Sequence, residues 1–198
     1  LIRIGIDPAN DSFRLECERH ADYVIQDYFT AEGFKSSKYG HKKVSVVTAI
    51  SMFYDVTDPD KFIQDVKEIM ADDGLWVLQL SYTPLFLQQM AWDNICHEHQ
   101  KYYSLFNLKA ILERNGMQVM DCELNNTNAG SFRVYAMKDE ADVTKFGSET
   151  HRDVCEFRVR SMVEYESMLE LDYISTWDKF YDNINFLKAK TVEFIKQK

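Results

Sequence analysis

The sequence predicts an α/β fold built on a parallel sheet, followed by a helical extension. Short apolar runs alternate with helical segments over the first part of the chain, and parallel strands need such helical crossovers. Beyond Gly147 the chain has no glycine or proline, and charged residues interleave with apolar ones at helical spacing. We therefore expect an α/β core over residues 1–138 and helices over residues 139–198.

The first strand is predicted over residues 1–6, an apolar run that is broken by an Asp-Pro pair. Asn10 can cap the helix that follows, because its side-chain oxygen can accept a hydrogen bond from the first turn. Residues 23–25 form a second strand. Residues 44–49 form a third, which is apolar on both faces and is therefore expected to lie between two layers of helices.

An Asp-Pro pair at residues 58–59 opens an amphipathic helix, since an acid followed by proline is a helix-start signal. An Asp-Gly pair at residues 73–74 is expected to end this helix before a fourth strand over residues 75–80. A further helix over residues 105–115 is closed by Gly116, the residue type preferred just after a helix.

Residues 117–124 and 132–137 alternate between apolar and polar types around an Asn-rich turn. This pattern predicts an antiparallel pair of strands. The remaining chain reads most simply as two long helices with a break near residues 172–176.

The composition is that of an ordinary soluble globular protein, with 45% hydrophobic residues and a net charge of −9. No apolar run approaches the ~20 residues of a membrane span, and an acidic chain repels a phosphate backbone. We therefore expect neither a membrane nor a nucleic-acid partner. The four cysteines are scattered without a Cys-x-x-Cys pair, which favours reduced thiols and a cytoplasmic location.

Residues 96–99, with the sequence Cys-His-Glu-His, form the densest cluster of ionisable groups in the chain. A histidine suits general-base catalysis because its unperturbed pKa of ~6.5 lies near working pH, and a neighbouring carboxylate can orient the ring. The spacing differs from the His-Glu-x-x-His of helical zinc proteases, so we expect no metal. A surface loop with two solvated histidines is the alternative.

Asp7 follows the first predicted strand. In doubly wound nucleotide-binding folds, an acid at such a strand end accepts hydrogen bonds from ribose hydroxyls. The alternative is that Asp7 and Pro8 only turn the chain. The glycine-rich turn that should precede such an acid by roughly 20 residues is not in this sequence. Either the cofactor interpretation fails or the sequence begins after that turn.

Four segments together carry a resemblance to a known family. They are Gly5–Ala9, Ser51–Asp55 before Asp58-Pro59, Trp92–Ser104 and Asn128–Val134. These segments resemble the S-adenosylmethionine-dependent C-methyltransferases that act on nucleotide-linked deoxysugars. The most specific strings are His-Glu-His-x-x-Tyr-Tyr-Ser and Gly-Ser-x-Arg-Val.

The resemblance implies a class I methyltransferase-like (Rossmann-like) sheet that binds S-adenosylmethionine. It also implies a fragment, incomplete at its N-terminus and without the domains that flank the core in the family, so the fragment alone is expected to be inactive. The implied substrate is a 4-keto-6-deoxysugar on a nucleoside diphosphate. A base would remove the proton beside the ketone, and the resulting enolate would take the methyl group.

The resemblance also assigns roles to individual residues. His99 matches the position of the base, with Glu98 and His97 as neighbours that orient or tune it. The implied cofactor contacts are Asp7, Asp27, Tyr28 and Ile50. The implied substrate contacts are Tyr54, Tyr82, Tyr102, Asn128, Ser131 and Arg133.

Three departures from the family pattern leave other functions open. Cys96 stands where the family often has tyrosine, Gln79 where an acid is common, and Ala129 where a glycine is usual. These changes favour a non-catalytic binding or assembly module as the alternative. A nicotinamide-dependent dehydrogenase is a further alternative, because Asp7 alone does not distinguish one adenosine ribose from another, and a zinc hydrolase ranks last. The oligomeric state is left open.

Overall fold

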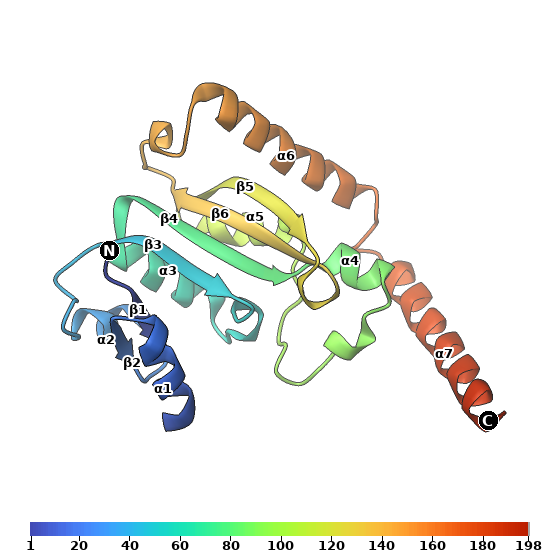
Figure 1. The fold of residues 1–198 in the computed structure, drawn as a ribbon. Coiled ribbons are helices and arrows are strands. Elements are labelled where there is room, and N and C mark those ends of the chain that lie inside the picture. Colours follow the sequence, from blue (N-terminus) through green and yellow to red (C-terminus); the bar gives the residue numbers. More distant parts are fainter. Residues whose placement is uncertain (198) are drawn as a thin grey trace.

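Residues 1–197 are described by a computed structural model with two sheets (Figure 1). The smaller sheet pairs β1 (Ile4–Ile6) with β2 (Tyr23–Ile25) in parallel. The larger sheet has the order β3-β4-β6-β5. Its strands are β3 (Val44–Ile50), β4 (Met70–Ser81), β5 (Met117–Asn125) and β6 (Ser131–Lys138). β3 and β4 are parallel, whereas β6 is antiparallel to both of its neighbours.

Helices connect these strands as the predicted alternation requires. The α-helices are α1 (Asp11–His20), α2 (Ala31–Lys35), α3 (Pro59–Ile69), α4 (Thr83–Gln88), α5 (Leu105–Arg114), α6 (Glu149–Ser167) and α7 (Ile174–Lys196). Short 3-10 turns are η1 (Phe53–Asp55), η2 (Trp92–Asn94), η3 (Thr127–Ala129) and η4 (Val143–Lys145). The predicted α/β class and the helical C-terminal part are confirmed.

The main core lies between the larger sheet and the helices α3 and α5. Alternate residues of β4, including Trp76, Leu78 and Leu80, are fully buried against it. α3 contributes Ile63 and α5 contributes Leu108 to the same cluster. α6 packs along β5, and α7 extends away from the body (Figure 1). Within the residues described, no helix is both long and apolar enough to cross a membrane.

Local signals at the helix ends are confirmed. Asn10 caps α1 by accepting a hydrogen bond from the backbone of Ser12, and Asp58 caps α3 by accepting one from Lys61 at 3.0 Å. Gly116 follows α5 with a φ of +73°, a conformation that glycine adopts without strain.

The predicted end of the third helix is wrong. α3 ends at Ile69, and β4 already includes the Asp-Gly pair at residues 73–74. The pairing of β3 with β4 shifts register in this region, and a Cβ on Gly74 would lie only 3.0 Å from the backbone oxygen of Ala71. The glycine therefore serves a bulge in the strand, where the backbone passes close to itself, and does not stop a helix.

The prediction that β3 lies between two helix layers is also wrong for the residues that the structure describes. Ala49 is buried on one face, but Val46 and Ile50 on the other are 54% and 47% exposed. The sequence of a strand shows whether each face is apolar, but it does not show which other segment covers that face.

Candidate active site

The loop that carries residues 96–104 is tied to the segment that follows β3. The backbone N–H groups of Gln100 and Lys101 both donate to the carbonyl oxygen of Tyr54. The Lys101 ammonium donates to the carbonyl oxygens of Val56, at 2.9 Å, and Thr57, at 3.1 Å. These bonds hold the loop beside η1 at the carboxyl end of β3.

His99 lies at this junction, half-buried between two aromatic rings. Its ring centroid is 4.3 Å from that of Tyr54 and 6.4 Å from that of Tyr102. Burial raises the pKa of Asp55, Glu98 adds to that rise, and the neighbouring His99 opposes it. The sequence indicates Asp55 only as part of the Ser51–Asp55 segment, and the fold is what brings it close to His99.

Among the described residues, the Glu98 side chain forms no hydrogen bond or ion pair with the His99 ring. The Glu98 carboxylate lies 3.8 Å from Nε2 of His97 and 3.9 Å from Sγ of Cys96. The His97 and Glu98 side chains are 92% and 73% exposed. These two neighbours therefore have the surroundings of a solvated surface loop, whereas His99 is packed.

The four predicted cofactor residues lie at or just beyond the carboxyl ends of β1, β2 and β3. One oxygen of Asp7 accepts a hydrogen bond from the backbone N–H of Ala9, and one oxygen of Asp27 accepts one from Tyr28, both at 2.7 Å. Among the described residues, the second oxygen of each carboxylate accepts no hydrogen bond. Asp7 thus turns the chain and keeps one free acceptor, while Tyr28 and Ile50 are exposed.

Two of the predicted substrate residues, Tyr82 and Ser131, are almost completely buried. Tyr82 is 1% exposed and belongs to the main core. Its hydroxyl has no hydrogen-bond partner in the described part of the chain, and burial together with the Glu166 carboxylate raises its pKa. Ser131 is also 1% exposed and donates to the carbonyl oxygen of Thr127. In this conformation both side chains serve packing and turn geometry, and neither is open to a ligand.

The other predicted substrate residues are less deeply buried, although Tyr54 is only 6% exposed and belongs to the main core. The Tyr54 ring contacts that of His99 at an interplanar angle of 54°, and Tyr102 donates its hydroxyl to the carbonyl oxygen of Asn94 at 3.2 Å. Asn128 is exposed in the turn between β5 and β6 with a φ of +48°, a region that asparagine tolerates well. Arg133 is half-buried and points at Gln79. The structure therefore brings together the side chains of Tyr54, His99 and Tyr102. Arg133 lies on β6 and is not part of this group.

Glu166 is a buried acid that the sequence analysis missed. It is 4% exposed, and its two oxygens accept the backbone N–H groups of Leu105 and Phe106 at 2.6 and 2.7 Å. The carboxylate therefore anchors the first turn of α5, directly after the loop with His99. No local signal could reveal it, because the acid and its partners are about 60 residues apart.

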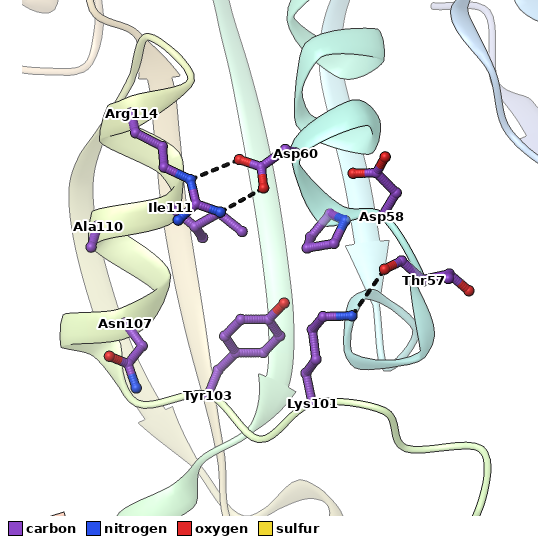
Figure 2. A pocket seen from close by; sticks show the side chains of 10 residues that line it. Thr57, Asp58, Asp60, Lys101, Tyr103, Asn107, Ala110, Ile111 and Arg114 are labelled. Carbon is purple, nitrogen blue, oxygen red and sulfur yellow. Dashed lines mark hydrogen bonds and ion pairs between the residues drawn. The ribbon is translucent and has the colours of Figure 1, made fainter. Parts of the chain in front are cut away.

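A cavity of about 610 Å³ lies between α3 and α5 (Figure 2), and His99 is not among the residues that line it. It is lined by Thr57, Asp58, Pro59, Asp60, Lys101, Tyr103, Asn107, Ala110, Ile111 and Arg114. Arg114 forms two bonds to Asp60, at 2.7 and 2.5 Å, and together with Asn115 it lowers the pKa of Asp60 to about 2. Burial raises the pKa of Tyr103 to about 12. The ion pair of Asp60 with Arg114 and the bonds of Lys101 to backbone engage charged groups of this cavity, whereas the Tyr103 hydroxyl has no hydrogen-bond partner among the described residues.

No group of three or more His, Cys, Asp or Glu side chains suited to a metal ion occurs among residues 1–197. The Cys-His-Glu-His cluster therefore offers no assembled metal site in this conformation.

Comparison with known proteins identifies the family. Residues 4–121 match the model of a methyltransferase domain. The chain is 29% identical over 139 residues to the C-methyltransferase NovU of Streptomyces niveus, covering 70% of this chain and 33% of that protein. The chain thus spans about a third of the length of this curated relative.

Solved structures show the same fold at low sequence identity. A methyltransferase in complex with the Trm112 activator of Haloferax volcanii superposes with a TM-score of 0.53 at 11% identity, covering 68% of this chain and 70% of that one. A SAM-dependent methyltransferase of Thermotoga maritima gives 0.50 at 13% identity, with 69% and 72% covered. The family model covers more than half of the chain, and the chain belongs to the methyltransferase domain family.

Proposed function

We propose that this protein is part of an S-adenosylmethionine-dependent C-methyltransferase that acts on the carbon beside the ketone of a nucleotide-linked deoxysugar. The observation that carries the proposal is the position of His99, half-buried against Tyr54 at the carboxyl end of the sheet. Ligands of open α/β sheets bind at that end of the strands. The likeness to a C-methyltransferase supports carbon as the atom that is methylated.

The residues at the strand ends fit the methyl donor. Asp7 and Asp27 each keep a carboxylate oxygen free, and a free carboxylate is the acceptor that a ribose diol needs. Tyr28 and Ile50 offer exposed apolar surface for an adenine ring. When bound, S-adenosylmethionine supplies an electrophilic methyl group.

His99 would act as the base at the substrate. It would take the proton from the carbon beside the ketone, leaving an enolate whose carbon then bonds to the methyl group as the donor's sulfur–carbon bond breaks. The enolate oxygen needs a hydrogen-bond donor. Burial raises the pKa of Tyr54, so its hydroxyl stays protonated and able to donate beside His99.

We further propose that residues 1–138 form part of a methyltransferase core, with residues 139–198 as a helical extension. Among residues 1–197, β1 pairs only with β2 and β3 only with β4, so each keeps an edge without a partner strand. Both edges border one hydrophobic cluster that includes Ile4, Phe34 and Val44. A further parallel strand of a longer polypeptide would pair between them and satisfy both edges.

Replacing His99 by asparagine in the complete protein tests the proposed base. We expect His99→Asn to lower turnover by about 10²–10⁴-fold, the usual contribution of a positioned base, while the affinity for S-adenosylmethionine stays nearly unchanged. Turnover is measured as donor consumption with a 4-keto-deoxysugar nucleotide, and donor affinity by calorimetry. His41→Asn, an exposed histidine away from the loop, is the control.

Equal rates for the wild type and His99→Asn would remove His99 from the mechanism. Absence of methyl loss from the donor in the wild-type protein would instead favour a non-catalytic binding module. The exposure of the Glu98 side chain, which pairs with His97, adds to the three sequence departures that favour that alternative.

A further inference from the structure

Arg133 is held in the larger sheet by a neutral side chain. Its Nε and Nη2 both donate to Oε1 of Gln79, at 3.2 and 2.7 Å. Nδ2 of Asn125 lies 3.5 Å from the same oxygen. Gln79 is 5% exposed, so the acceptor is buried, whereas Arg133 is half-buried. An amide oxygen orients the guanidinium group but leaves its positive charge uncompensated.

No carboxylate forms an ion pair with Arg133 in the part of the chain that the structure describes. Glu123 stands directly opposite Arg133 on β5, but its carboxylate accepts the hydroxyl of Tyr135 at 3.1 Å and pairs with Arg158 at 3.5 Å. Arg158 also pairs with Asp121. The acids on this side of β5 are therefore engaged, and the charge of Arg133 is available to a ligand.

The position of Arg133 connects it to the candidate active site. The strand pairing places Ile50, Gln79 and Arg133 in one row across the sheet. Paired residues of neighbouring strands present their side chains to the same face, and two strand spacings put Arg133 roughly 10 Å from Ile50. Ile50 is 47% exposed, so this face is open beside Gln79. Shortly after Ile50 comes Tyr54, the residue that contacts His99.

We propose that Arg133, oriented by Gln79, binds an oxyanion group of a ligand, either a phosphate or a carboxylate. A guanidinium fork matches both groups, because each presents two oxygens in a plane. The identity of the ligand rests on the proposed function, in which the diphosphate of the sugar nucleotide and the carboxylate of the methyl donor share this chemistry. Because Gln79 is neutral, the positive charge of Arg133 stays available to a ligand, whereas an acid at position 79 would form an ion pair with Arg133 and neutralise it.

Titration with inorganic diphosphate tests the site without requiring turnover. Calorimetry and the Nε–Hε NMR signal of Arg133 are expected to show saturable binding. Gln79→Glu should weaken that binding at least tenfold, because the new carboxylate takes the guanidinium group, and it should keep or raise the thermal midpoint. Arg160→Gln changes an exposed arginine of α6 near Glu164 and should leave the affinity unchanged.

Competition identifies the source of the oxyanion. Displacement of diphosphate by uridine diphosphate assigns Arg133 to the sugar nucleotide, and displacement by S-adenosylhomocysteine assigns it to the donor carboxylate. If neither displaces it, Arg133 has no part in methyl transfer. A titration without saturation, or equal affinities for the wild type and Gln79→Glu, would overturn the site itself. A negative His99→Asn result would leave these outcomes untouched.

Discussion

At the residue scale, the buried carboxylate of Glu166 shows how a single side chain fixes the candidate site. The first turn of a helix has backbone N–H groups without helical partners. In α5, Ser104 accepts the N–H of Asn107, and Glu166 accepts those of Leu105 and Phe106. Because Ser104 ends the loop that contains His99, the anchor on α6 also fixes one end of that loop.

Glu166→Ala is expected to destabilise the fold by about 2–4 kcal/mol, because it leaves two N–H groups near the core without acceptors. Glu166→Gln retains one acceptor oxygen and should cost less than the alanine variant. Urea unfolding measures both changes. The matched control is Glu164→Ala on the same helix, where an exposed acid should change the unfolding free energy by less than about 0.5 kcal/mol. Equal values for Glu164→Ala and Glu166→Ala would contradict the anchoring role.

At the element scale, α3 and α5 are joined across the cavity by the pair of Asp60 and Arg114. Asp60 lies in the first turn of α3, and Arg114 in the last turn of α5, where their charges also suit the helix dipoles. The two hydrogen bonds from Arg114 (Figure 2), together with one from Asn115, lower the pKa of Asp60 to about 2. The folded state therefore prefers the ionised carboxylate.

This preference predicts how the link depends on pH. The folded pKa of about 2 lies below the ordinary value of 3.8, so the stabilisation is present above pH ~4 and is lost as the pH falls toward 2. We expect the unfolding free energies of wild type and Asp60→Asn to differ by up to about 1 kcal/mol near pH 5.5, because the pair is exposed to solvent. The difference should shrink below pH 3 in urea titrations. In an Arg114→Met background most of this pH dependence should disappear, and its persistence would refute the pairing.

The elements themselves divide into those that the sequence can predict and those that it cannot. Caps such as Asn10 and Asp58, and the glycine after α5, act within a few residues and were predicted correctly. The Asp-Gly pair at residues 73–74 was misassigned because the bulge depends on the neighbouring strand. The same limit explains why His99 could be proposed from a motif while its packing on Tyr54 could not.

At the scale of the whole molecule, the buried contact of α7 with the body, among residues 1–197, lies in the first half of the helix. Phe180 is 8% exposed and packs on Phe86 of α4, with ring centroids 4.9 Å apart. Trp177 and Ile184 extend this contact, and Nε1 of Trp177 also donates to the carbonyl oxygen of Leu171. The large apolar side chains further along the helix are exposed, including Phe186, Val192, Phe194 and Ile195.

This arrangement predicts graded opening along α7. Amide hydrogen exchange should be fastest over residues 186–196 and slower over residues 177–184, because the buried Phe180 and its neighbours Trp177 and Ile184 lie in the earlier part. Phe180→Ala removes the central contact, a loss of about 3 kcal/mol for a buried phenylalanine, and should bring the exchange of the first half up to that of the second. Phe186→Ala, at a side chain that is 66% exposed on the same helix, should leave the first half protected. Uniform protection along α7 would show instead that the helix is stabilised over its whole length, and that its exposed apolar side chains are covered in solution.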